Sequence, residues 1–126
     1  MFVRSLDEII GTDRDVDWGN GQSRRLLVES DNMGFAFLDT IVKAGTDLEI
    51  QYKNHLESVY CIEGKGSITD IATGKKHEIR PGVMYVLDQH DLHRLRATED
   101  LRLMCVFNPP LKGDEKHNMD KPGTSY

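Results

Sequence analysis

Short runs of β-forming residues, divided by turn sequences, fill most of this chain and restrict the folds that it can adopt. Turns such as Glu63-Gly64 and Pro81-Gly82 separate the runs. Nine runs are predicted to be strands, at residues 24–29, 35–42, 48–53, 58–63, 67–71, 76–80, 83–87, 92–96 and 101–107. Strands that recur about every 8–12 residues indicate a β-sandwich or barrel, and the double-sheet jelly roll is the compact form for one domain.

One short helix is expected near the start of the chain. Ser5 and Glu8 have the spacing of a capping box, and Leu6, Ile9 and Ile10 would form the apolar side of the helix. The sequence predicts a single domain over residues 1–126. Its last part, residues 109–126, is polar and interrupted by proline and glycine, and is interpreted as a tail or a lid over the barrel mouth.

Composition excludes several classes of partner. The net charge of -5 argues against nucleic acid. No apolar run approaches the roughly 20 residues of a membrane span, and the first ten residues lack the apolar core of a signal peptide. Cys61 and Cys105 lie in apolar runs and are expected to be buried free thiols, which favours the cytoplasm.

The segment from Gly45 to Gly64 matches the spacing of the first cupin motif but lacks its histidines. That motif requires glycine, two histidines, glutamate and glycine at fixed intervals; Glu57 falls in place, whereas Gln51 and Lys53 occupy the histidine positions. The second cupin motif is matched only at Gly82 and His93. The two partial matches stand in the correct order on a strand-rich chain, so a cupin barrel is predicted.

Strand alternation indicates which side chains face the interior, because successive residues of a strand point to opposite faces. Residues 48–53 direct Tyr52 inward with their apolar face and Gln51 and Lys53 outward. The same reasoning directs Cys105 and Phe107 inward in residues 101–107.

Glu57, His93 and a nearby tyrosine are therefore candidate metal ligands. A carboxylate, an imidazole and a phenolate suit a hard or borderline divalent ion such as iron(II), and three protein ligands leave positions open for a substrate. The alternative is a polar pair, Glu57 and His93, at the barrel mouth without a metal.

Longer blocks resemble ectoine synthases, a family of cupins. These blocks are NMGFAF (32–37), YKNHLESVYCIEG (52–64), PGVMYVLDQHDLHRLRA (81–97) and CVFNPP (105–110). The resemblance implies a cupin-type double-stranded β-helix, a cytoplasmic homodimer and Fe2+ as cofactor, with another divalent metal as an alternative. It also implies a lyase of compatible-solute biosynthesis, active under osmotic stress, that closes N-γ-acetyl-L-2,4-diaminobutyrate into ectoine with loss of water.

Carried over position by position, the resemblance implies roles for eleven residues. The metal ligands would be Glu57, Tyr85 and His93. The residues around the substrate would include Arg25, Thr40, Cys105 and Phe107. Because the reaction must remove a proton from an ammonium and deliver protons to a departing oxygen, four further neighbours of the substrate are candidate acids and bases: Tyr52, His55, Glu115 and His117.

Two positions depart from the family pattern. Gly21 stands where the family usually has a tryptophan, and Leu38 where a polar residue is common; the only tryptophan is Trp18. The departures lie in the substrate-facing region and leave two other functions open. One is a cupin enzyme acting on another N-acyl diamino acid, and the other is a cupin that binds a small molecule without turnover.

Overall fold

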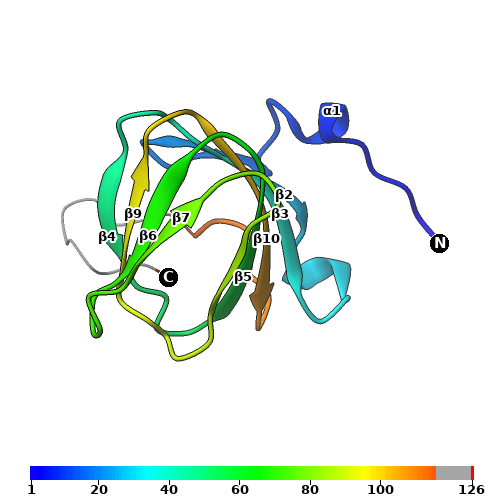
Figure 1. Cartoon of the computed structure of the whole chain (residues 1–126). Coiled ribbons are helices and arrows are strands. Elements are labelled where there is room, and N and C mark those ends of the chain that lie inside the picture. Colours follow the sequence, from blue (N-terminus) through cyan, green and yellow to red (C-terminus); the bar gives the residue numbers. More distant parts are fainter. Residues whose placement is uncertain (116–125) are drawn as a thin grey trace.

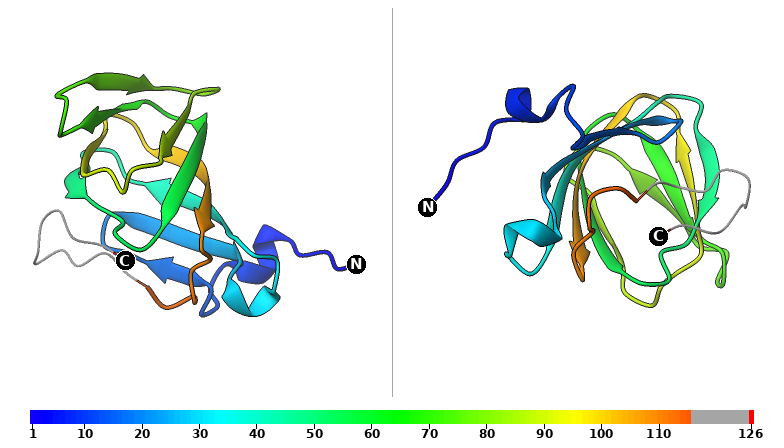
Figure 2. Two further views of the ribbon diagram at one scale, coloured as in Figure 1. Left: turned by 90° about the horizontal axis from the view of Figure 1, so that it is seen from below. Right: turned by 180° about the vertical axis from the view of Figure 1, so that it is seen from behind.

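Two antiparallel sheets form the body of the protein in the computed structural model, which describes residues 1–115 and residue 126. The larger sheet has the strand order β1-β2-β3-β10-β5-β8, with β1 (Asp15–Asp17), β2 (Gly21–Leu27), β3 (Ala36–Val42), β10 (Leu101–Asn108), β5 (Leu56–Glu63) and β8 (Met84–Leu87). The smaller sheet has the order β4-β9-β6-β7, with β4 (Asp47–Ile50), β9 (His93–Ala97), β6 (Gly66–Asp70) and β7 (Lys76–Ile79). The sheets curve around a common interior as a jelly-roll barrel (Figures 1 and 2), which confirms the predicted fold class.

Each of the nine predicted strands overlaps an observed one, and β1 is the strand that the sequence did not indicate. Its residues Asp15–Asp17 read as a loop because aspartate disfavours strands. They form a strand because they pair with residues 22–24 of β2 across a hairpin at the edge of the sheet.

The predicted helix is present as α1 (Leu6–Ile9), outside the barrel (Figure 1). The backbone N–H of Ser5 donates to Glu8 Oε2 at 3.4 Å, as the capping-box pattern predicts. A 3-10 turn, η1 (Glu29–Asp31), follows β2. No helix among the described residues is long and apolar enough to cross a membrane.

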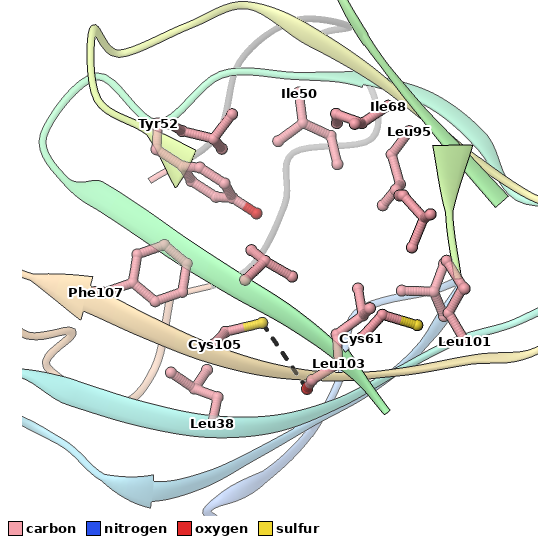
Figure 3. Close-up of a cluster of buried hydrophobic side chains, with 14 of the residues drawn as sticks. Leu38, Ile50, Tyr52, Cys61, Ile68, Leu95, Leu101, Leu103, Cys105 and Phe107 are labelled. Atoms are coloured by element: carbon pink, nitrogen blue, oxygen red, sulfur yellow. Dashed lines mark hydrogen bonds between the residues drawn. The ribbon is translucent and has the colours of Figure 1, made fainter. Parts of the chain in front are cut away.

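Alternating apolar residues from both sheets fill the barrel, as Figure 3 shows. On β10, Leu101, Leu103, Cys105 and Phe107 are buried while the residues between them face outward. Burying each such leucine or phenylalanine stabilises the fold by about 1.5–3 kcal/mol. Cys61 and Cys105 are both buried free thiols, as expected.

One carboxylate, Asp31, ties the N-terminal segment to the barrel. Its Oδ2 accepts hydrogen bonds from Arg14 Nη1 and from the backbone N–H of Val28, both at 2.9 Å. Its Oδ1 accepts one from Arg4 Nη2 at 3.3 Å. The Arg14 hydrogen bond is the largest cause of a pKa for Asp31 lowered from 3.8 to about 2.

Replacing Asp31 with asparagine is expected to lower the free energy of unfolding by about 2 kcal/mol at pH 7, since each pKa unit corresponds to about 1.4 kcal/mol. Because the pKa of Asp31 is lowered, its carboxylate stabilises the fold above about pH 4. This stabilisation is lost as the pH falls from about 4 toward 2. Urea denaturation at pH 7 and at pH 3 should therefore show a difference that shrinks in acid. Asp7→Asn on α1 is the matched control; an Asp31→Asn effect that is equal at both pH values would contradict the assignment.

Candidate active site and metal centre

A cavity lies inside the barrel, lined by the inner faces of both sheets. Its lining includes seven of the residues predicted for the site: Thr40, Tyr52, Glu57, Tyr85, His93, Cys105 and Phe107. Figure 3 shows Tyr52, Cys105 and Phe107 directed toward this interior, as strand alternation predicts. About 40 Å³ of the cavity is free, which is room for a few water molecules.

Three metal-donor side chains reach the cavity from three strands. Glu57 on β5 and Tyr85 on β8 lie on the same inner face of the larger sheet, because Val59 pairs with Tyr85 and Glu57 with Leu87. His93 comes from β9 of the opposite sheet. Glu57 is 6% and His93 2% exposed, so the sheets bring these donors into a nearly dry space.

This donor set fits a divalent metal. Burial raises the pKa of Glu57 to about 8, and a hydrogen bond from the Cys105 thiol opposes that rise. A bound cation would offset the cost of burying this carboxylate. Histidine, cysteine and carboxylate side chains form no cluster of three among the described residues. Tyr85 lines the same cavity and is the candidate for the third donor, and two oxygen ligands with one nitrogen ligand would suit iron(II) better than a thiolate-seeking metal.

A hydrogen bond fixes the tautomer of His93. Its Nδ1 lies 2.9 Å from the carbonyl oxygen of Asp91, so Nδ1 must carry the proton and donate it. Burial lowers the pKa of His93, which favours the neutral ring. Nε2 is left with its lone pair, and a metal-binding histidine is commonly oriented by such a bond from its other nitrogen.

The surroundings of Cys105 favour its thiol form. Burial and the neighbouring Glu57 carboxylate raise the pKa of Cys105 well above its ordinary value. Its Sγ lies 3.7 Å from the Thr40 hydroxyl oxygen. Cys105 can thus donate weakly to Glu57 or Thr40, and this environment disfavours the thiolate form that covalent catalysis would need.

Arg25 is a fully buried cation beside the cavity. Its Nε donates to Ser23 Oγ at 3.2 Å, and its Nη2 donates to the carbonyl oxygen of Glu115. Nη1 lies 3.6 Å from Glu115 Oε1 and is buried without a hydrogen-bond partner among the described residues. A buried guanidinium with an unfilled donor is suited to receive the carboxylate of a ligand.

His55 and Glu115 lie at the mouth of the barrel. His55 Nδ1 lies 2.7 Å from the carbonyl oxygen of Pro109, so it donates there and leaves Nε2 as an acceptor. Glu115 accepts the backbone N–H groups of Lys112 and Gly113, both at 2.8 Å. Burial opposes ionisation of Glu115, but these N–H groups and Arg25 outweigh it and lower the pKa of Glu115. The predicted His117 lies outside the described residues.

Two aromatic walls of the cavity were not predicted. The Tyr126 ring packs on the rings of Tyr52 and Phe107, with centroids 5.1 and 5.7 Å away, and lies 5.9 Å from the Arg25 guanidinium carbon. Trp18, between β1 and β2, is 5% exposed and also lines the cavity. The sequence carried no signal for Tyr126, because its segment lacks periodicity.

The two departures from the family pattern have a structural explanation. At Gly21 the backbone φ is +147°, and a Cβ atom would lie 1.9 Å from the carbonyl oxygen of Ile41, so no side chain fits there. Trp18, three residues earlier, supplies an indole to the cavity. Leu38 is 1% exposed and makes one wall of the cavity apolar.

Comparison with known proteins gives consistent matches over nearly the whole chain. A family model described as ectoine synthase matches residues 1–124. An L-ectoine synthase of Desulfatibacillum aliphaticivorans is 57% identical over 122 residues, which is 95% of this chain and 94% of that protein. An L-ectoine synthase of Marinomonas sp. strain MWYL1 is 53% identical over 122 residues, covering 95% of both chains.

Solved structures agree. The crystal structure of ectoine synthase from P. lautus superposes with a TM-score of 0.86 at 53% identity, over 90% of this chain and 81% of that one. A cupin 2 conserved barrel domain protein of Salinispora arenicola superposes with a TM-score of 0.64 at 17% identity, over 85% of this chain and 87% of that one. The second likeness supports the cupin barrel alone.

Proposed function

This chain belongs to the ectoine synthase family, and we propose that it closes N-γ-acetyl-L-2,4-diaminobutyrate into ectoine with loss of water. The observation that carries this proposal is that two features meet at one cavity. The donor set Glu57, Tyr85 and His93 faces it from the strands, and Arg25 Nη1, which has no hydrogen-bond partner among the described residues, lies beside it.

The substrate would lie with its carboxylate on Arg25 and its amide oxygen toward the three donors. A guanidinium is well suited to hold a carboxylate, and Arg25 Nη1, which has no hydrogen-bond partner among the described residues, would donate to it. The apolar wall from Leu38 and Phe107 would fold the chain of the substrate on itself and exclude water.

Glu57, Tyr85 and His93 would hold iron(II) as the resident metal. When bound, the metal supplies a Lewis acid for the amide oxygen, and polarising that oxygen contributes several kcal/mol to the transition state. Burial and the nearby Glu57 carboxylate raise the pKa of Tyr85, so Tyr85 has to release its proton to become a ligand.

The remaining chain residues would move protons. The C–N bond forms when the amine attacks the amide carbon, the carbon–oxygen bond breaks, and the oxygen leaves as water with, in net terms, the two protons that the ammonium loses. His55 Nε2 carries a lone pair at the mouth and would take the ammonium proton. Tyr52 keeps its proton because burial raises its pKa, and would donate to the departing oxygen. Glu115 would position Arg25, and a role for His117 stays a prediction.

The direct test is a cyclisation assay with protein stripped of metal and then supplied with iron(II). We expect ectoine formation from the acetylated diamine only after metal is restored. A panel of other N-acyl diamino acids tests the alternative suggested by Gly21 and Leu38. Faster turnover of another member would overturn the substrate assignment, and ligand binding without any turnover would overturn the enzymatic one.

Tyr126 lines the cavity proposed for the substrate and would have to yield to it, so Tyr126→Ala is expected to strengthen binding. The free volume of about 40 Å³ is too small for the substrate, and ring contacts of about 0.5–1.5 kcal/mol each must be given up before it enters. Calorimetric titration with ectoine should give a Kd about tenfold lower for Tyr126→Ala. Tyr126→Phe, which keeps the ring, is the control. A higher Kd for Tyr126→Ala would mean that the ring contacts the ligand instead of yielding to it.

The family resemblance also implies a homodimer in the cytoplasm, and the outer face of the larger sheet supports the dimer. Apolar side chains on β8, β5 and β10 lie side by side there: Met84, Val86, Leu56, Tyr60, Met104 and Val106. Met84 is 62% and Tyr60 47% exposed. A contiguous apolar patch of this kind is typical of a protein interface.

Placing a charge in this face is expected to separate the subunits. Tyr60→Glu should sediment as a monomer at a concentration at which the parent protein is a dimer, since an unpaired charge at a buried interface costs several kcal/mol. Ile71→Glu, an equally drastic change on an exposed residue of the β6–β7 turn, is the control. If Tyr60→Glu remains a dimer and Ile71→Glu does not, the interface lies away from the outer face of the larger sheet.

A further inference from the structure

A short turn carries two of the residues proposed to move protons. Residues 51–55 connect β4 to β5 and include Tyr52, whose ring is directed into the barrel (Figure 3), and His55. The bond from His55 Nδ1 to the carbonyl oxygen of Pro109 holds one end of this turn. The other end contacts His90, in the connection between β8 and β9. The position of Tyr52 therefore depends on a contact between two connecting segments.

Two hydrogen bonds run in opposite directions between His90 and the turn. His90 Nδ1 lies 2.9 Å from the carbonyl oxygen of Tyr52, so Nδ1 carries the proton and donates it. Gln51 Nε2 donates to the carbonyl oxygen of His90 at 3.0 Å. A side chain from each segment thus holds the backbone of the other. We call this pair of hydrogen bonds the His90 clamp.

The backbone of His90 has a conformation that favours glycine. Its φ is +52°, in the left-handed region where a Cβ atom is crowded. Such strain persists only where surrounding contacts hold it, and strained residues cluster at functional sites. Glycine would relieve the strain at this position but would lose the ring that holds Tyr52. A histidine here therefore indicates that its ring is used.

The clamp also sets Tyr52 relative to the metal donor His93. Ile50 at the end of β4 pairs with His93 at the start of β9. The carbonyl oxygen of Asp91, the residue after His90, lies 2.9 Å from His93 Nδ1. Neighbouring residues of one connection thus orient both side chains, whose ring centroids are 5.9 Å apart with an interplanar angle of 39°.

We propose that His90 is a positioning residue for the cyclisation: through the clamp it holds the Tyr52 hydroxyl where that group can donate a proton to the departing oxygen. This rests on the proposed function, because it takes Tyr52 as the proton donor. His90 itself is exposed and is not among the residues that line the cavity, so it acts through Tyr52. A displacement of about 1 Å in a reacting group can cost about a hundredfold in rate.

The first test removes the ring and keeps the backbone conformation. His90→Gly is expected to lower kcat about 10- to 100-fold and to change KM less than about threefold, because Tyr52 acts in proton transfer and not in binding. His90→Asn should stay within about threefold of the parent kcat, since its Nδ2–H group stands close to the place of Nδ1–H and asparagine tolerates positive φ. Asn32→Gly is the matched control. Asn32 has a φ of +59° and lies outside the cavity, so kcat and KM should not change.

The second test separates positioning of Tyr52 from a general loosening of the site. In a Tyr52→Phe protein, which lacks the hydroxyl, His90→Gly should lower kcat by less than about a further twofold, because groups that act as a unit are not additive. Metal-free His90→Gly should bind cobalt(II) with the Kd of the parent. A further tenfold loss of kcat in the Tyr52→Phe protein, or a Kd raised about tenfold, would overturn the proposal and assign the effect of His90 to His93.

The position of Tyr52 can also be followed without turnover. Labelling with 3-fluorotyrosine gives fluorine NMR signals for the four tyrosines, and Tyr52→Phe identifies the Tyr52 signal by its absence. In metal-free protein, His90→Gly should shift or broaden this signal, and His90→Asn should retain it. The signal of Tyr60, which is exposed on the outer face of the larger sheet, should stay unchanged in both.

The outcomes separate the clamp from the function. An unchanged Tyr52 signal in His90→Gly would overturn the clamp, and cyclisation by the parent protein would leave the proposed function standing. A parent protein that does not cyclise the acetylated diamine, with a Tyr52 signal that follows His90, would overturn the proposed function and leave only a contact that orients Tyr52. Urea denaturation checks that each variant is folded. If His90→Gly does not fold, His90→Asp replaces it, because ionised aspartate has the size of asparagine and no donor for the carbonyl oxygen of Tyr52.

Discussion

Glu57→Gln is expected to abolish specific metal binding and lower the cyclisation rate at least about a thousandfold, while making the metal-free protein more stable. Glu57 is the one carboxylate in the proposed ligand set, and an amide oxygen is a far weaker partner for iron(II). Losing the Lewis acid removes several kcal/mol of transition-state stabilisation, and each 1.4 kcal/mol is about a factor of ten in rate.

The gain in stability follows from the pKa of Glu57. Burial raises it from 4.5 to about 8 in the metal-free protein. The folded state therefore holds a proton that the unfolded state releases, and stability falls as the pH rises from about 4.5 to about 8. At pH 7 this costs on the order of 3 kcal/mol, and glutamine, which does not ionise, avoids most of it.

This prediction is checked by measuring metal content, turnover rate and thermal unfolding on the parent, Glu57→Gln and a control variant. Thermal unfolding after metal removal should give a higher Tm for Glu57→Gln than for the parent at pH 7.5, and nearly equal values at pH 4.5. Added iron(II) should raise the Tm of the parent but not that of Glu57→Gln. Glu49→Gln on the outside of β4 is the control and should match the parent throughout. A variant that keeps its metal and turns over at the parent rate would remove Glu57 from the site.

Strand alternation in the sequence predicted the inward direction of three residues proposed for the site. Tyr52, Cys105 and Phe107 were assigned inward from their place in apolar rows, and all three are buried. Gln51 was assigned outward, and its Nε2 donates to the carbonyl oxygen of His90 at 3.0 Å. This pattern is readable because each strand buries one face, so a shift of one residue would expose its whole apolar row.

Features that depend on contacts between distant segments could not be predicted in this way. Tyr126 enters the cavity although it is more than about 70 residues from Tyr52, and no local pattern sets its position. The place of Trp18 depends on a hairpin that forms only because Gly21 accepts a backbone conformation closed to other residues.

Arg25→Lys is expected to raise the KM for the acetylated diamine about 10- to 100-fold with a smaller effect on kcat. Lysine keeps the positive charge but replaces a planar fork by a single point of contact. A hydrogen bond to a charged group is worth about 1.5–3 kcal/mol, which corresponds to this range. Arg25 is fully buried, so urea denaturation of the variant must accompany the kinetics to show that it remains folded under assay conditions.

A substrate analogue makes the assignment of Arg25 specific. If Arg25 binds the substrate carboxylate, then the methyl ester of the substrate should already lack that interaction, and Arg25→Lys should change its KM little. The two losses would then be strongly non-additive, as expected for groups in direct contact. Glu115 provides the comparison, because it pairs with Arg25 at 3.6 Å and also accepts two backbone N–H groups. Glu115→Gln should therefore disturb the position of Arg25 and of the backbone at residues 112 and 113. It should raise the KM of the acid and of the ester alike. If Arg25→Lys raises the KM of the acid and of the ester by the same factor, Arg25 has a structural role at the mouth. Another residue would then bind the substrate carboxylate.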